Sequence, residues 1–133
     1  MPGKPKAAVL LKKARDDQQL LLQMIANRFG TDEQVGFYCQ QAVEKAIKAV
    51  LEERGVSYRF THDLAELIDA LIDHPIAYPA EMNVAVDLTP FAAGLRYHDL
   101  PTDATGDDTF DREAAAQIVR VTIDWAAKIV PGV

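Results

Sequence analysis

The chain has 133 residues, a formal net charge of −6 at pH 7 and an apolar content of 49%. This length suits one domain, residues 1–133, that folds without disulfides or metal ions, and residues 1–6 are expected to be flexible. Charged residues follow the basic start of the chain closely, so we expect neither a signal peptide nor a membrane span. Cys39 lies in an apolar helical pattern and is expected to be a buried thiol in a cytoplasmic protein.

The charge is divided unevenly along the chain. Residues 1–59 contain ten Lys or Arg and seven Asp or Glu, a balance of +3, whereas residues 60–133 contain four and thirteen, a balance of −9. An acidic chain repels the phosphates of nucleic acids, so contact with RNA would require a local basic patch.

Apolar residues at helical spacing over residues 7–29 predict a first long helix, which Gly30 is expected to end. Its predicted core face comprises Leu11, Ala14, Leu21, Ile25 and Phe29, and Gln18 interrupts it. Thr31 to Gln34 is a capping-box pattern and starts a second helix, which carries a broad apolar stripe and ends at Arg54-Gly55.

The next elements are shorter or interrupted. Residues 56–60 are expected to form a loop, because a lone five-residue strand would have no partner. Thr61 is expected to cap a third helix over residues 62–73, which stops before Pro75. A fourth helix starts at Pro79 and should bend at Pro90. Its predicted core face comprises Met82, Ala85, Leu88, Ala92 and Leu95.

Residues 99–111 contain five aspartates and are expected to form an exposed loop. Asp111 or Thr109 should cap a last helix that ends at Pro131, with Ile118, Val121, Trp125 and Ile129 on its core face. Together the segments predict an all-α fold, an up-and-down bundle of four long helices and one short helix.

The second helix and the turn after it carry a distinctive pattern. It reads Phe37-Tyr-Cys-Gln-Gln-Ala-Val-Glu-Lys-Ala-Ile-Lys, then Arg54-Gly55, then Thr61-His-Asp-Leu64. In order and spacing this resembles the signature of the HEPN family, and Leu95-Arg96-Tyr97 falls where many members carry an Arg-Tyr pair. The resemblance covers nearly the whole chain. It implies a helical bundle that forms a homodimer and is often encoded beside a minimal nucleotidyltransferase.

The resemblance supports three functional hypotheses. Many members are metal-independent ribonucleases with an Arg followed four to six residues later by a His, whereas here His98 lies two residues after Arg96. The first hypothesis is therefore a homodimeric subunit that works with a nucleotidyltransferase protein in a toxin–antitoxin-like pair. The second is a ribonuclease, and the third is a bundle that binds a nucleotide without catalysis.

In the ribonuclease hypothesis, Arg96 stabilises the phosphorane charge and His98 acts as acid or base. Residues two apart on a helix point to different faces, so the two side chains converge only if the helix ends near Tyr97. Arg96 could instead be a cation at a helix C-terminus or a phosphate ligand, and Tyr97 could stack on a base.

A polar face on the second helix is the other candidate site. Gln41, Glu44, Lys45 and Lys48 lie opposite the apolar stripe, as solvated surface or as a surface for a partner or nucleotide, with Gln41, Lys45 and Lys48 as binding residues.

His62-Asp63 resembles half of a metal-dependent phosphohydrolase motif, but further ligands are not evident, and His62 is expected to bond a neighbouring helix. Residues 103–114 lack the Glu that a calcium loop needs at its last position. We therefore expect no metal site and no cofactor.

Overall fold

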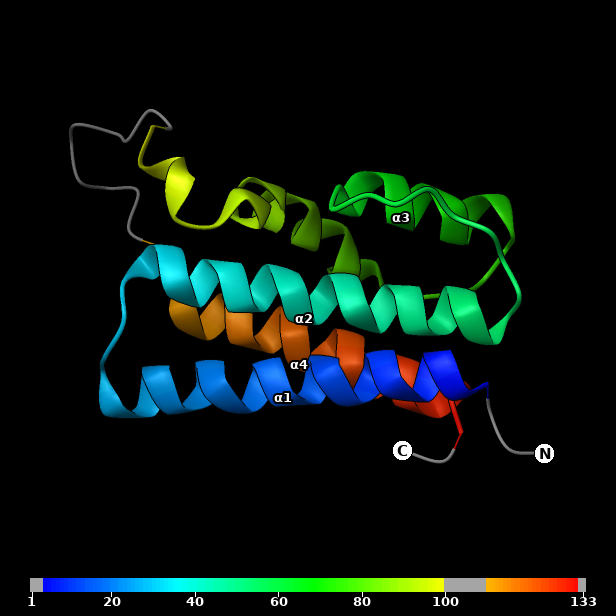
Figure 1. Ribbon diagram of the computed structural model, residues 1–133, viewed down its shortest axis with the longest axis horizontal. Coiled ribbons are helices and arrows are strands. Elements are labelled where there is room, and N and C mark those ends of the chain that lie inside the picture. The colour runs from blue at the N-terminus through cyan, green and yellow to red at the C-terminus, as the bar shows by residue number, and fades with distance from the viewer. Residues whose placement is uncertain (1–3, 100–109, 132–133) are drawn as a thin grey trace.

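The computed structural model describes residues 4–99 and 110–131, and it describes side chains for residues 4–90 and 110–131. All regular structure in these ranges is helical (Figure 1). The elements are α1 (Pro5–Asn27), α2 (Asp32–Glu53), α3 (Leu64–Asp73), the 3₁₀-helical segment η1 (Ala80–Asp99) and α4 (Arg112–Ile129). This confirms the predicted all-α bundle of four long elements and one short helix.

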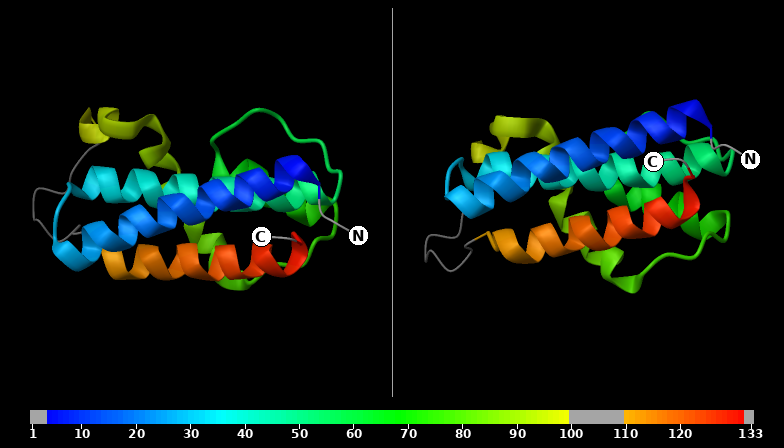
Figure 2. Two further views of the ribbon diagram at one scale, coloured as in Figure 1. Left: turned by 60° about the horizontal axis from the view of Figure 1, so that its bottom comes forward. Right: turned by 90° about the horizontal axis from the view of Figure 1, so that it is seen from below.

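Helix α2 is the centre of the bundle. It runs antiparallel to α1, and α4 packs against both, while α3 and η1 cover the opposite side of α2 (Figures 1 and 2). Thirteen of the 22 residues of α2 are buried, which is far more than one apolar stripe provides. The side chains of α2 therefore meet protein in nearly every direction.

The chain reverses direction after α2 and runs back along it. Gly55 adopts a left-handed conformation, with φ of +69°, which turns the chain at the end of the helix. Residues 56–63, which we call the return segment, then pass along α2, so that α3 starts level with the middle of α2 and runs parallel to it (Figure 1). The loop predicted for residues 56–60 is confirmed, and its course brings the Tyr58 hydroxyl to Glu52 of α2.

Helix starts depend on side-chain caps. The capping box predicted at Thr31 is present, with the Thr31 hydroxyl accepting from the Gln34 N–H at 3.1 Å. Asp111 caps α4 by accepting from the Ala114 N–H at 3.0 Å. Thr61 does not cap the third helix, which starts at Leu64 because the Asp63 side chain accepts from the Ala65 N–H.

The helices bury apolar faces, as predicted, but some of the buried residues differ from those expected. Helix α1 ends at Asn27, before Gly30, with Arg28 in the left-handed cap conformation at φ of 55°. Phe29 therefore lies outside the helix and is 47% exposed, and Met24 takes its place in the core. On α4 the predicted core residue Trp125 is buried, and Ile118 and Ile129 are partly buried against the core. The other buried residues of α4 are Ala115, Val119, Thr122, Ile123 and Ala126.

The fourth element is a 3₁₀ helix that contains Pro90, where a bent α-helix was predicted. Met82, Ala85 and Leu88 are buried, as expected. Their spacing of three residues matches the three residues per turn of a 3₁₀ helix, so this winding aligns all three toward the core. The side chains of Ala92 and Leu95 lie outside the described part of the structure.

No helix in the described residues is both long enough and apolar enough to cross a membrane.

Candidate functional site

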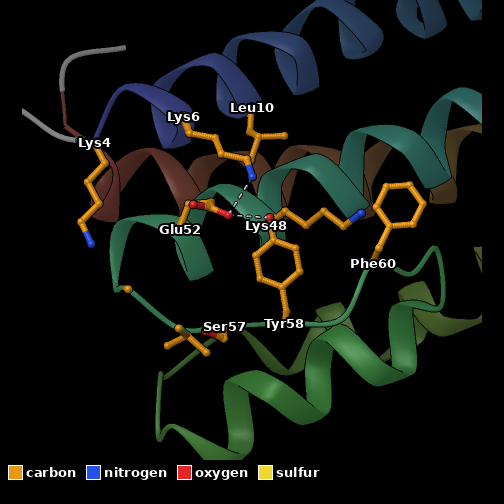
Figure 3. A pocket seen from close by; sticks show the side chains of 10 residues that line it. Lys4, Lys6, Leu10, Lys48, Glu52, Ser57, Tyr58 and Phe60 are labelled. Atoms are coloured by element: carbon orange, nitrogen blue, oxygen red, sulfur yellow. Dashed lines mark hydrogen bonds and ion pairs between the residues drawn. The ribbon is translucent and has the colours of Figure 1, made fainter.

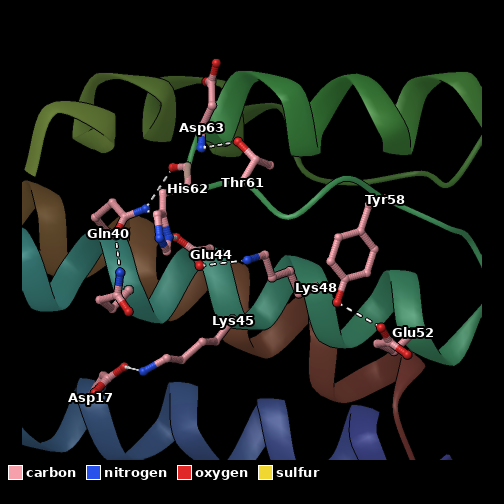
Figure 4. Close-up of polar contacts among 11 residues, drawn as sticks. Asp17, Gln40, Glu44, Lys45, Lys48, Glu52, Tyr58, Thr61, His62 and Asp63 are labelled. Atoms are coloured by element: carbon pink, nitrogen blue, oxygen red, sulfur yellow. Dashed lines mark hydrogen bonds and ion pairs between the residues drawn. The ribbon is translucent and has the colours of Figure 1, made fainter. Parts of the chain in front are cut away.

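A buried polar network joins α2 to the return segment (Figure 4). At its centre is Glu44, which is 4% exposed. One carboxylate oxygen of Glu44 accepts from Gln40 Nε2 at 2.8 Å and lies 2.9 Å from His62 Nδ1. The other oxygen accepts from Lys48 Nζ at 2.9 Å. Gln40, Glu44 and Lys48 are four residues apart, so α2 places all three on one face.

The network keeps Glu44 charged. Burial raises the pKa of this carboxyl, but hydrogen bonds from Lys48, Gln40 and His62, together with the charge of Lys48, outweigh burial and hold the pKa below its usual value of 4.5. A carboxylate with three donors and a paired ammonium is compensated even though it is buried.

Gln40 ties the network to the backbone. Its Nε2 also donates to the carbonyl of His62 at 3.0 Å, and its Oε1 accepts from Gln41 Nε2 at 2.7 Å. Because Gln40 is fully buried, these bonds satisfy an amide that has no access to water. The return segment is therefore held against α2 by both a side chain and a carbonyl of His62.

The structure changes the interpretation of the polar face predicted on α2. Glu44 and Lys48 are buried, so solvated surface is wrong for these two residues. Lys45 is half-buried and pairs with Asp17 of α1 at 2.7 Å, and Gln41 is half-buried beside Gln40. The sequence did not reveal this, because i, i+4 polar residues look the same on a solvated helix and beneath a covering segment. A ligand- or partner-binding role for Gln41, Lys45 and Lys48 stays a prediction.

The expectation that His62 bonds a neighbouring helix is confirmed, because its ring contacts Glu44 of α2. Its side chain is half exposed, so one side of the ring faces the buried carboxylate while the rest reaches the surface. Asp63, the other half of the supposed metal motif, caps α3. Within the part of the chain that the structure describes, no group of three or more His, Cys, Asp or Glu is placed to hold a metal ion.

A pocket of about 610 Å³ adjoins the network at the end of α2 (Figure 3). Its walls come from the start of α1, the second half of α2 and the return segment. The lining residues are Lys4, Lys6, Leu10, Lys48, Glu52, Gly55, Val56, Ser57, Tyr58 and Phe60. Lys48 belongs to both features, since its ammonium bonds Glu44 and also lies 5.9 Å and 5.3 Å from the ring centres of Tyr58 and Phe60.

Glu52 organises the polar wall of this pocket. It accepts a hydrogen bond from the Tyr58 hydroxyl at 2.9 Å and pairs with Lys6 at 3.4 Å. Burial and the bond to Glu52 both raise the pKa of Tyr58, so the phenol is neutral at physiological pH. The pocket was not predictable from the sequence, because its residues come from three separated segments.

The predicted catalytic residues lie at the end of η1. The backbone of Arg96, Tyr97 and His98 is part of η1, which continues to Asp99. Their side chains are outside the described part of the structure, and so are residues 103–109 of the supposed calcium loop. The catalytic assignment to Arg96 and His98 therefore stays a prediction.

Comparisons with known proteins agree on one family. The HEPN domain model matches residues 7–129. The crystal structure of an archaeal HEPN homologue aligns with a TM-score of 0.65 at 19% identity, over 96% of this chain and 99% of that one, which shows a shared fold. The comparison with curated proteins finds no match. Because the family model spans almost all of the 133 residues, the chain belongs to the HEPN domain family.

Proposed function

We propose that the protein is a homodimeric HEPN subunit that acts with a minimal nucleotidyltransferase in a toxin–antitoxin-like pair and does not itself cleave RNA. The observation that carries this proposal is that the residues of the family signature bond to one another inside the bundle. Gln40, Glu44 and Lys48 are buried, and Glu44 meets both Lys48 and His62. Side chains that bond to one another in this way stabilise the bundle, and the outer faces of the bundle are left for partners.

The sequence near the end of η1 supports the same proposal. His98 follows Arg96 by two residues, and the ribonuclease pattern of the family separates them by four to six. In a 3₁₀ helix, residues three apart share a face and residues two apart do not. The backbone of η1 extends to Asp99, beyond the end near Tyr97 that convergence of the two side chains would require.

Exposed apolar side chains provide surface for self-association. Val9 and Leu20 of α1 are 51% and 37% exposed, and because they are separated by about three helical turns they lie on the same face of the helix. Apolar groups left in water favour contact with another protein surface. The proposed dimer can be checked by light scattering of the purified chain, with Val9→Glu and Leu20→Glu variants expected to shift it toward the monomer.

The partner is tested by co-expressing the tagged chain with any minimal nucleotidyltransferase that the genes next to its own encode. We expect a stable complex that survives affinity purification and gel filtration. A chain that elutes alone, while both proteins are soluble and folded, would overturn the partner assignment.

A second candidate function is metal-independent RNA cleavage by Arg96 and His98. It is favoured by the presence of an arginine and a histidine two residues apart in the sequence at the end of η1, since a guanidinium and an imidazole are the two types of group that such cleavage needs. Purified protein is incubated with mixed RNA in chelator, beside Arg96→Ala and His98→Ala. Cleavage by the wild type alone, with a pH optimum near the titration range of an imidazole, would replace the first proposal by the second.

A further inference from the structure

An apolar groove lies at the end of α3, on the side of α2 that faces away from α1 (Figure 1). We infer that this groove and the acidic residues around it form a docking surface for a basic amphipathic segment of a partner protein. The inference goes beyond the proposed function, because it holds whether the partner is a nucleotidyltransferase or another protein. It involves neither the buried network around Glu44 nor the pocket beside Lys48.

The groove has an entirely apolar or aromatic lining. Its volume is about 390 Å³, and it lies between the last turn of α3 and the chain that leads to η1. The lining residues are Leu71, Ile72, Pro75, Ile76, Ala77 and Tyr78. Ile72 is 58% exposed, and a large apolar side chain left in water beside an apolar groove favours contact with another protein surface. An apolar side chain of a partner would fill the groove and cover Ile72.

Hydrogen bonds hold the walls of the groove in place. Nε1 of Trp125, on α4, donates to the carbonyl of Ala77 at 2.8 Å. The Tyr78 hydroxyl donates to Oδ1 of Asn83 at 2.8 Å, so the polar group of this ring is already bonded. Because the walls are fixed before a partner arrives, binding requires little further ordering of the protein.

The charge around the groove indicates the kind of partner that fits it. Residues 60–90 contain six carboxylates and no Lys or Arg, a balance of −6 that equals the net charge of the whole chain. These carboxylates are Asp63, Glu66, Asp69, Asp73, Glu81 and Asp87. An apolar groove in acidic surroundings is complementary to a segment that combines apolar side chains with Lys or Arg.

Two of the carboxylates lie next to Ile72. Asp69 and Asp73 are both exposed, and their spacing of four residues places them on one outer face of α3. Within the described residues, no cation pairs with either of them. They also line a second hollow, of about 250 Å³, between the return segment and α3. Both carboxylates are therefore available to cations that a partner brings to the groove.

Glu66 shows how a cation binds to this face of α3. It lies three residues before Asp69, and its two carboxylate oxygens accept from the guanidinium of Arg59 at 2.8 Å and 2.7 Å. The chain thus supplies one cation for the first carboxylate on the face. Lys or Arg side chains of the partner would pair with Asp69 and Asp73 in the same way, while an apolar neighbour enters the groove.

A second copy of the chain is a poor fit for this surface. In a symmetric dimer the same surface of each copy meets itself, so the acidic face of one copy would lie against the acidic face of the other. Like charges brought together in this way weaken an interface. Val9 and Leu20, which provide surface for the proposed homodimer, belong to α1 on the other side of α2. The partner and the second copy therefore use different surfaces.

The test is calorimetric titration of the full-length protein with three helical peptides. The first carries leucines on one face and lysines on the other, the second has glutamate for each lysine, and the third has serine for each leucine. We expect the first peptide to bind, with an affinity that falls as salt is added, and the others to bind at least about tenfold more weakly. Failure of the first peptide to bind, or equal binding of either control peptide, would overturn the inference.

A pair of variants tests the apolar contact. Ile72→Ser should weaken binding of the first peptide by about tenfold, because an apolar contact is lost. Leu22→Ser, at an apolar side chain that is 46% exposed on α1, should leave the affinity unchanged. Because Ile72 is exposed, its replacement should not affect folding, so an unchanged affinity in Ile72→Ser would refute the groove as the binding site.

A second pair of variants tests the acidic contact. Asp69→Asn with Asp73→Asn should weaken binding by about fivefold and reduce its dependence on salt. Glu113→Gln with Asp124→Asn removes the same charge from exposed positions of α4 and should change the affinity little. Equal losses in the two double variants would show a general attraction to an acidic protein and would overturn the site.

Light scattering of Ile72→Ser distinguishes a partner protein from a second copy. We expect the variant to have the same molar mass in solution as the wild type. A shift of Ile72→Ser toward the monomer would show that another copy of the chain covers the groove, and it would overturn the inference of a basic partner.

Discussion

The carboxylate of Glu44 lies 2.9 Å from the imidazole of His62, eighteen residues further along the chain. This contact joins the middle of α2 to the residues that precede α3 (Figure 4). Since the same carboxylate also binds Gln40 and Lys48, one buried charge fixes both the return segment and the start of α3.

Replacement of Glu44 by Gln should be strongly destabilising. The change leaves the buried ammonium of Lys48 without its charged partner, which is expected to cost about 3–5 kcal/mol of unfolding free energy. Urea denaturation followed by circular dichroism measures this loss of unfolding free energy. The matched control is Asp124→Asn, the same chemical change at an exposed position of α4, which should stay within about 0.5 kcal/mol of wild type. Similar stabilities for the two variants would contradict a central role for Glu44.

The stability of the protein should depend on pH through the same group. The fold lowers the pKa of Glu44 from its usual 4.5, so at acid pH the unfolded chain binds this proton more readily than the folded one. The contribution of Glu44 is therefore complete above about pH 4.5 and is lost as pH falls through the folded pKa. Urea denaturation from about pH 7 to about pH 3 should show a steeper loss in wild type than in Glu44→Gln.

The fold also lowers the pKa of Glu66, so the contribution of Glu66 to the pH dependence must be distinguished from that of Glu44. Its hydrogen bond with exposed Arg59 lowers its pKa, and that pair is open to solvent. Salt at about 0.5 M screens an exposed pair far more than a buried one. A loss of stability at acid pH that is equally steep in wild type and in Glu44→Gln, and that becomes smaller in salt, would assign the pH dependence to the surface pair.

Cys39 should be unreactive in the folded protein. It is fully buried, and burial raises the pKa of its thiol to about 12, so almost no thiolate is available at neutral pH. A thiol reagent should label it only after denaturant is added. An Ile72→Cys variant, at an exposed site, should label at once in the same buffer. Rapid labelling of native wild type would show that this part of the core opens readily.

Arg112 should hold the start of α4 to the turn between α1 and α2. It donates to Asp32 Oδ1 at 2.9 Å and to the carbonyls of Phe29 and Gly30 at 3.2 Å and 2.9 Å. Loss of these bonds in Arg112→Ala should lower the unfolding free energy by about 1–3 kcal/mol. Arg120→Ala, at an exposed position of the same helix, is the control in thermal denaturation. Equal melting temperatures for the two variants would refute this role.

Much of the fold follows from local sequence signals. The capping box at Thr31 and the glycine at 55 mark the limits of α2 because they act through neighbouring backbone groups. The burial of Glu44 and Lys48 depends on a segment that arrives later in the chain, and no local pattern reveals it. Similarly, Asp63 and Thr61 are both good caps, and the choice of Asp63 depends on how the return segment meets α2.

The candidate sites were less predictable for the same reason. Periodicity predicted that Lys48 lies on the polar face of α2, but the pocket also needs Lys4 from the start of the chain and Phe60 from the return segment. The spacing of three residues between Met82, Ala85 and Leu88 was visible, yet it fits the edge of an α-helical face as well as a 3₁₀ helix. Only packing against α2 distinguishes the two.

The position of α2, covered by α1, α4, η1 and the return segment, also determines how the molecule opens. Its amides are shielded on every side, whereas the return segment is bound by a few polar side chains. Local fluctuations should therefore release the return segment and α3 first and expose the α2 backbone only when the whole bundle unfolds. In native-state hydrogen exchange, the slowest amides should belong to the middle of α2, and their opening free energy should equal that of global unfolding.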